Sequence, residues 1–152
     1  MFNEGLQDLY QELILDHNAR PHNFGALPKA THHAHGLNPL CGDDIEVFLD
    51  MKGGTIARAM FSGHGCAISK ASASLMTDAV MNQNSARVLE LFEIFHRLVT
   101  GVSVSAGEMS ELGKVAAFAG VKEFPARVKC ASLAWHTLKA ALNNTQDHVS
   151  TE

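Results

Sequence analysis

Cysteine, proline and long apolar runs are scarce in this sequence. Among its 152 residues are three cysteines and four prolines, and no run approaches the roughly 18 apolar residues that a membrane-spanning helix needs. Residues 1–10 carry acidic side chains where a secretory signal carries lysine or arginine. We therefore expect a cytoplasmic protein without membrane contact. An odd number of widely spaced cysteines predicts free thiols or metal ligands rather than a disulfide framework.

Positive charge is also scarce. Lysine and arginine total 12 against 16 acidic residues, for a formal net charge of -4, so no basic stripe is present and nucleic-acid binding is not expected. The hydrophobic content of 46% suffices for one core. We expect a single domain over residues 1–152, in which residues 143–152 form a frayed tail because they lack apolar periodicity.

The first half of the chain predicts one helix and a small sheet. Residues 6–17 have apolar side chains at helical spacing, and residues 30–36 fit a short edge strand. Residues 44–51 alternate apolar and polar side chains, as a strand with one buried face does. The pair Gly53-Gly54 then favours a hairpin turn, with residues 55–61 as the returning strand.

The second half changes to helical periodicity. A helix is expected to begin at or near Cys66, and residues 86–99 form a second amphipathic helix. After a loop over residues 101–107, a short helix is expected at 108–118 and a last helix at 125–142. The predicted fold class is α+β: a small antiparallel sheet of about three strands packed against a set of α-helices.

The candidate site residues lie at glycine-flanked junctions. Gly42 lets the backbone turn so that the thiol of Cys41 and the carboxylate of Asp43 can converge. Cys66 follows Gly65 at the predicted start of a helix, where the helix N-terminus favours a thiolate. These two junctions could face each other at one end of the sheet.

Cys130 is the third thiol. It follows Arg127 and Lys129, and this local positive charge is expected to lower the pKa of its thiol. Three thiolates and one carboxylate would suffice for tetrahedral Zn²⁺ or one corner of an iron–sulfur cluster. The spacing of the cysteines matches no short zinc-ribbon pattern, so it equally allows three unrelated buried cysteines.

Histidines offer a further candidate. His32, His33 and His35 could form a second metal site, but on a strand only His33 and His35 would share a face. His64 and His22 are better candidates for supporting or proton-transfer roles if they lie near Cys66.

Four motifs are distributed along residues 9–142. They are Leu9-Tyr10 through Asp16-His17 to Arg20-Pro21 and Asn23; Asn38-Pro39-Leu40-Cys41-Gly42-Asp43; Phe61 through Gly65-Cys66-Ala67-Ile68-Ser69 to Ala71-Ser72-Ala73-Ser74; and Phe124-Pro125-Ala126-Arg127-Val128-Lys129-Cys130-Ala131 to Trp135. Through these motifs the chain resembles the SufU branch of the IscU/NifU N-terminal scaffold family.

The resemblance implies a small antiparallel sheet covered by helices and a surface site whose metal and cofactor ligands are Cys41, Asp43, Cys66 and Cys130. It implies iron–sulfur cluster assembly, as a scaffold for a nascent cluster, of the 2Fe–2S type, or as a zinc-bound acceptor of persulfide sulfur. The partners would be a SufS-type cysteine desulfurase and downstream recipient or carrier proteins. Such a protein is an accessory rather than a free-standing enzyme.

Within that site we expect Cys41 to accept sulfur, because it lies on a flexible glycine-flanked loop. Lys129 stands where IscU-type proteins carry a histidine, and residues 124–129 replace the segment that an Hsp70-type chaperone recognises, so binding of that chaperone is in doubt. Arg127 is interpreted either as a cation that balances the site or pairs with Asp43, or as a solvated helix charge. Together with Lys129 and His64 it forms the expected surroundings of the ligands.

Two other interpretations of the ligand set remain. A closed four-ligand zinc site could be purely structural and serve a protein-interaction module. A hydrolytic zinc enzyme fits less well, because four protein ligands leave no open coordination position and no HExxH-type base is present.

Overall fold

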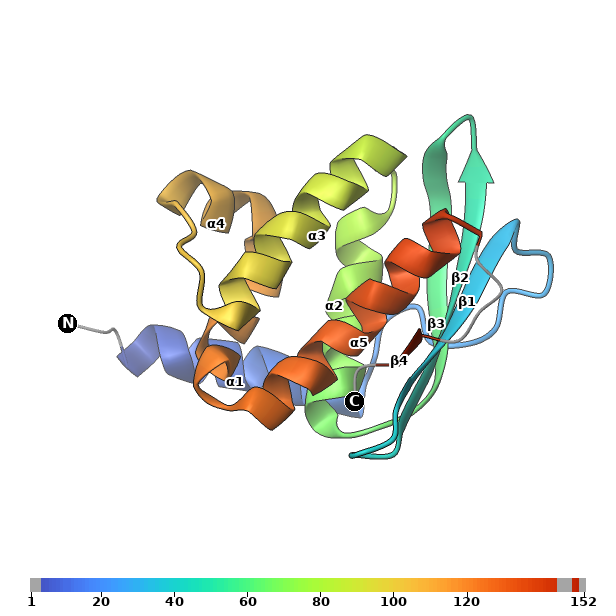
Figure 1. The fold of residues 1–152 in the computed structure, drawn as a ribbon. Helices are drawn as coiled ribbons and strands as arrows, with labels where there is room; N and C mark the ends of the chain where they lie inside the picture. The colour runs from blue at the N-terminus through green and yellow to red at the C-terminus, as the bar shows by residue number, and fades with distance from the viewer. Residues whose placement is uncertain (1–3, 145–148, 151–152) are drawn as a thin grey trace.

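The computed structural model describes residues 4–144 and 149–150. Its sheet is formed by β1 (His32–Asn38), β2 (Asp43–Lys52) and β3 (Thr55–His64), with the two-residue strand β4 (Val149–Ser150) added at one edge. The order is β3-β2-β1-β4; the first three strands are antiparallel and β4 runs parallel to β1. Figure 1 shows these strands beside the layer of helices. The predicted three-stranded antiparallel sheet is confirmed.

The β2–β3 hairpin follows from the alternating pattern. Ile45, Val47 and Leu49 of β2 are fully buried, whereas the residues between them are only partly buried. Gly53 and Gly54 form the connecting turn, as expected. Both strands are longer than predicted, and β3 continues to His64, which carries it up to the first residues of the next helix.

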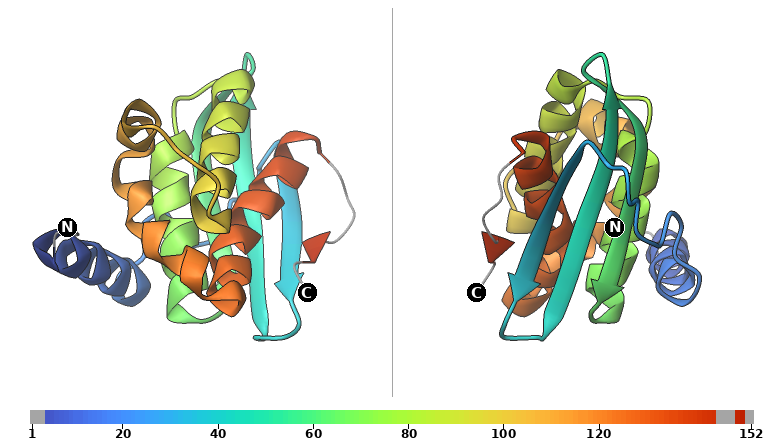
Figure 2. Two further views of the ribbon diagram at one scale, coloured as in Figure 1. Left: turned by 60° about the vertical axis from the view of Figure 1, so that its left-hand side comes forward. Right: turned by 90° about the vertical axis from the view of Figure 1, so that its right-hand side faces the viewer.

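Helices cover one face of the sheet, as Figure 2 shows. They are α2 (Ala67–Val80) and α5 (Pro125–Leu142). Outside them, α3 (Ser85–Thr100) packs against α5, and α1 (Glu4–Ala19) packs against α2. The ring of Trp135 on α5 stacks on that of Phe95 on α3, with centroids 4.7 Å apart, and both side chains are buried. These aromatic contacts lock α3 to α5 in the core.

The predicted helix over residues 108–118 is wrong in its boundaries. Two elements replace it: α4 (Ala106–Leu112) and the 3₁₀ helix η1 (Gly113–Glu123). The α-helix begins earlier because Ser105 and Glu108 form a capping box. It ends at Gly113, whose φ of 57° is incompatible with continuing a right-handed helix.

The C-terminal residues were expected to fray. Residues 145–148 and 151–152 lie outside the described part of the chain, and Val149–Ser150 pairs with Gly36 and Leu37 of β1. Within residues 4–144 and 149–150, no helix has both the length and the apolar character needed to cross a bilayer.

Candidate metal centre

Cys41 and Asp43 are placed by the turn between β1 and β2. The carbonyl of Asn38 accepts hydrogen bonds from the backbone N–H groups of Cys41 (3.1 Å) and Gly42 (2.9 Å), which closes the turn. Gly42 has a φ of 74°, a conformation that favours glycine. The turn leaves Cys41 exposed, whereas Asp43 at the start of β2 is buried, with 1% of its surface exposed.

Cys66 is the N-cap of α2, as the sequence predicted. Its Sγ accepts a hydrogen bond from the backbone N–H of Ser69 at 3.4 Å. Its own backbone N–H donates to Oδ1 of Asp43 at 2.8 Å, and its Sγ lies 3.9 Å from Oδ2 of the same carboxylate. The two junctions do face each other, and Asp43 is the residue that joins them.

Gly65 permits this close approach. A Cβ at position 65 would lie 2.8 Å from Oδ1 of Asp43 and 3.2 Å from Oγ of Ser69. A side chain here would push the carboxylate out of its place. The glycine before Cys66 is therefore required by the contact between the start of α2 and Asp43.

Cys130 reaches the same place from α5, which begins at Pro125. Its side chain is buried, and its Sγ lies 3.5 Å from Sγ of Cys41 and 3.8 Å from Nδ2 of Asn38. The ligand atoms of Cys41, Asp43 and Cys130 all lie within 4.8 Å of one another. In Figure 1 the β1–β2 turn, the start of α2 and the first turns of α5 lie at one end of the molecule.

The donor set matches the dimensions of a tetrahedral site. With metal–sulfur bonds of about 2.3 Å, the sulfur–sulfur edges of a tetrahedron are about 3.8 Å long. The observed Cys41–Cys130 separation is 3.5 Å and the Cys66–Asp43 separation is 3.9 Å. Cys41, Asp43 and Cys130 therefore place their ligand atoms at a spacing that fits zinc or the iron of a cluster, and Cys66 approaches this group at Asp43.

The electrostatics of Cys130 differ from the sequence prediction. Burial, followed by hydrogen bonding with the thiols of Cys66 and Cys41, raises the pKa of the Cys130 thiol above its usual range. The expected lowering by Arg127 and Lys129 is wrong. Positive charge next to Cys130 in sequence does not offset the loss of hydration. A metal cation bound by the sulfur would favour the thiolate form.

The residues predicted to surround the ligands are exposed or only partly buried. Arg127 is exposed, and its guanidinium carbon lies 4.4 Å from the centroid of the Phe124 ring. Lys129 is partly buried on α5, and His64 is exposed at the end of β3. His22 pairs with Asp78 instead of lying at Cys66.

The three neighbouring histidines of β1 have separate partners. Nδ1 of His32 lies 2.9 Å from Oγ1 of Thr31, and His33 stacks on Phe48. His35 pairs with Asp44. The arrangement favours ordinary strand positions over a shared metal site.

Sequence reasoning assigned no role to Asn38 and Ser69. Both are fully buried beside the ligands, and Oδ1 of Asn38 and Oγ of Ser69 have no hydrogen-bond partner among the described residues. Because buried polar atoms are normally satisfied, these two oxygens indicate a site arranged for a further polar group. A role for Asn38 could have been predicted from the sequence, because it lies within one of the four motifs and is a polar residue on the buried face of β1.

A model of the family described as NifU-like N terminal domain matches residues 9–131. The chain belongs to this family. The matched region includes Cys41, Asp43, Cys66 and Cys130, so all four gathered residues fall inside the family domain.

Two curated relatives cover most of this NifU-like chain. It is 39% identical over 92% of its length to the iron-sulfur cluster assembly scaffold protein IscU of Streptococcus pyogenes serotype M1, of which 86% is covered. It is 38% identical over 91% of its length to the zinc-dependent sulfurtransferase SufU of Bacillus subtilis (strain 168), of which 92% is covered.

Solved structures agree with the fold. A crystal structure of a hypothetical protein, 39% identical, superposes with a TM-score of 0.83 over 90% of this chain and 98% of that one. A putative iron-sulfur cluster assembly scaffold protein for the SUF system from Fervidobacterium islandicum AW-1, 31% identical, superposes with a TM-score of 0.79 over 90% and 98% of the two chains.

Proposed function

We propose that this protein takes part in iron–sulfur cluster assembly, with Cys41, Asp43, Cys66 and Cys130 as the ligands of zinc or of a nascent cluster. The observation that supports it most is that Cys41, Asp43 and Cys130 place their ligand atoms within 4.8 Å of one another, while Sγ of Cys66 lies 3.9 Å from Oδ2 of Asp43. Relatives named as an assembly scaffold and as a zinc-dependent sulfurtransferase support the same process.

The donor set suits both forms of the proposal. Thiolates bind zinc and cluster iron alike, and the harder carboxylate oxygen of Asp43 is the ligand that exchanges most readily. Its Oδ1 accepts a hydrogen bond from Cys66, which leaves Oδ2 for a metal. Bound Zn²⁺ would hold the thiols as thiolates and so remove the need for a separate base. If a cluster is built, the 2Fe–2S type remains the expectation.

Cys41 is the proposed sulfur acceptor. Cys41 and Cys66 are exposed and Cys130 is buried, but Cys66 is held as the N-cap of α2, whereas Cys41 lies on the β1–β2 turn. The Cys41 thiolate attacks the terminal sulfur of a persulfide on the partner desulfurase. A new sulfur–sulfur bond forms on Cys41, and the cysteine of the desulfurase leaves as a thiolate.

Two exposed apolar side chains support contact with a protein partner at this end. Leu40, directly before Cys41, is 71% exposed, and Phe124, at the start of α5, is 46% exposed. Exposed apolar groups beside a functional site mark interaction surfaces. The proposed partner is a SufS-type cysteine desulfurase, followed by a recipient or carrier of the cluster or sulfur. Location in the cytoplasm remains a prediction from the sequence.

The decisive experiment uses Cys41→Ala with a SufS-type desulfurase and free cysteine. We expect the wild-type protein to accelerate sulfide release under reducing conditions and the variant to lose that acceleration. Because Cys41 is exposed, the fold of the variant should be unchanged by circular dichroism. Undiminished acceleration would remove Cys41 from its role.

Purification without oxygen identifies the metal that the protein carries. A brown protein with visible charge-transfer bands supports a scaffold that carries a cluster, and a colourless protein with one zinc per chain supports sulfur transfer. A protein with neither, even after incubation with iron, sulfide or zinc, would contradict the proposed site.

A further inference from the structure

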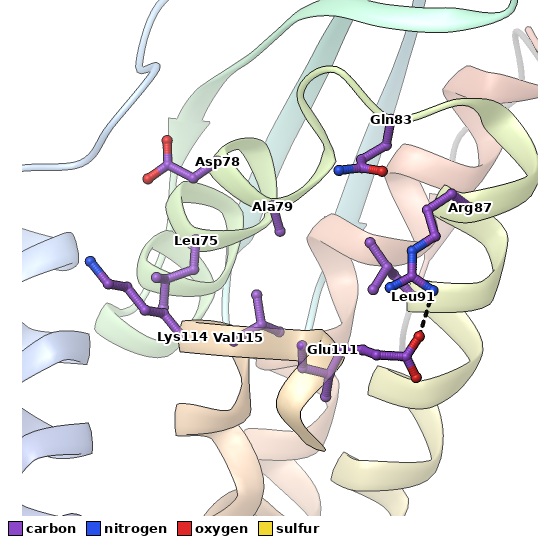
Figure 3. A pocket seen from close by; sticks show the side chains of 11 residues that line it. Leu75, Asp78, Ala79, Gln83, Arg87, Leu91, Glu111, Lys114 and Val115 are labelled. Carbon is purple, nitrogen blue, oxygen red and sulfur yellow. Dashed lines mark hydrogen bonds and ion pairs between the residues drawn. The ribbon is translucent and has the colours of Figure 1, made fainter. Parts of the chain in front are cut away.

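A second cluster of metal-binding side chain types lies away from the cysteines. His17 is in the last turn of α1, His22 follows that helix, and Asp78 is in the last turn of α2. One nitrogen or oxygen atom from each lies within 4.8 Å of those of the other two. In Figure 3 the carboxylate of Asp78 points away from Arg87 and Glu111, which line a cavity of about 280 Å³ next to it.

Neighbouring groups hold these side chains in place. Nδ1 of His17 lies 2.6 Å from Oγ of Ser74, and the same oxygen accepts a hydrogen bond of 2.7 Å from the backbone N–H of His22. The side-chain amide of Asn23 donates to Oδ1 of Asp78 at 2.9 Å. Ligand side chains in metal sites are oriented by such outer hydrogen bonds.

The three side chains lie close enough to share one ion. Nδ1 of His22 lies 2.5 Å from Oδ2 of Asp78, which is the carboxylate oxygen that Asn23 does not bind. The ring of His17, which is only 2% exposed, lies 4.3 Å from the ring of His22 between centroids. An ion pair between His22 and Asp78 alone would not need a second, buried imidazole beside it.

We propose that His17, His22 and Asp78 bind one divalent transition-metal ion of the class that includes Zn²⁺ and Fe²⁺. Two imidazoles and one carboxylate suit these ions, whereas Mg²⁺ and Ca²⁺ prefer oxygen ligands alone. The ion takes the place of the direct contact between Nδ1 of His22 and Oδ2 of Asp78. Three protein ligands leave at least one coordination position for water.

This site is independent of the cysteine site. Cys66 and Asp78 lie at opposite ends of α2, and a helix rises about 1.5 Å per residue, so the two sites are about 18 Å apart. The ion would join α1 and the segment after it to α2. Ion binding should therefore stabilise the packing of the N-terminal helix against the rest of the domain.

The test is an oxygen-free titration of the full chain with Co²⁺, which reports both sites by absorption. We expect two ions per wild-type chain: one with an intense thiolate-to-cobalt band in the near ultraviolet, and one with weak visible bands only. His22→Gln and Asp78→Asn should each bind one ion and keep the thiolate band. Added Zn²⁺ or Fe²⁺ should compete for the second ion.

Two control variants lie outside the cluster. His32→Gln and Asp8→Asn each remove the same kind of group from elsewhere in the chain and should still bind two ions. A cooperative thermal unfolding transition in EDTA shows whether each variant folds. If Asp78→Asn does not fold, the test rests on His22→Gln. A wild type that binds only the ion with the thiolate band, or cluster variants that bind as many ions as the wild type, would overturn the proposal and leave His22 and Asp78 as an ordinary ion pair.

Discussion

The backbone N–H of Cys66 donates a 2.8 Å hydrogen bond to Oδ1 of Asp43, which ties the start of α2 to the start of β2. The same carboxylate presents Oδ2 to Sγ of Cys66 at 3.9 Å. One oxygen of Asp43 therefore positions the site while the other remains available as a ligand. Both roles depend on a carboxylate with little freedom to rotate.

Gly65→Ala tests that arrangement. The new Cβ would meet Oδ1 of Asp43 at 2.8 Å, so we expect zinc affinity to fall about 10- to 100-fold, as it does when outer contacts of a ligand are lost. Competition with a chromophoric chelator measures the affinity. Gly120→Ala is the matched control, because a Cβ there meets nothing within 4 Å. Equal affinities for the two variants would contradict the role of Gly65.

Asp43→Ala separates sulfur transfer from a purely structural zinc site. Loss of the buried carboxylate leaves the N–H of Cys66 without its acceptor, which should cost about 1–3 kcal/mol of the free energy of unfolding. We expect the variant to remain folded by circular dichroism but to lose acceleration of the desulfurase. A variant that is unfolded at 25 °C, while Asp44→Ala stays folded, would favour the structural interpretation.

Metal binding should release protons, because burial raises the pKa of the Cys130 thiol in the metal-free protein. We expect Zn²⁺ binding near pH 7.5 to release about two to three protons and to tighten as the pH rises. Calorimetry in buffers of different ionisation enthalpy gives the number. Cys130→Ala should release about one proton fewer, and an unchanged number would exclude Cys130 as a ligand.

Glu108 gives the fold a pH dependence separate from the metal site. Its hydrogen bond with Arg97, followed by that with the backbone of Ser105, lowers the pKa of the carboxyl from 4.5 to about 2. A lowered pKa in the folded state stabilises the protein above the unfolded pKa, and this stabilisation is lost as the pH falls from about 5 toward 2. The urea midpoint of the wild type should fall more over this interval than that of Glu108→Gln. Parallel curves would contradict the pairing.

Elements determined by neighbouring residues could be predicted from the sequence. Alternation marked β2, and Pro125 marked the start of α5, because burial of one face and the fixed φ of proline act locally. The break at Gly113 was missed. A glycine within a helical pattern is compatible with either continuation or termination, and here the positive φ of Gly113 ends the α-helix.

The chemical environment of the site was less predictable. Arg127 and Lys129 are neighbours of Cys130 in sequence, but burial of the thiol among Cys41 and Cys66 determines its pKa. The burial of a side chain depends on residues from other segments that pack around it. It cannot be predicted from the residues next to that side chain in the sequence.

By itself the sequence determined the kinds of donor atoms, the type of most elements and, through four motifs, the resemblance to a family. Apart from what that resemblance implies, only the tertiary structure decided which donors meet. Cys41 and Cys130 are separated by 89 positions, and His22 and Asp78 by 56. Local patterns cannot encode contacts over such separations, because these contacts arise from packing helices against a sheet.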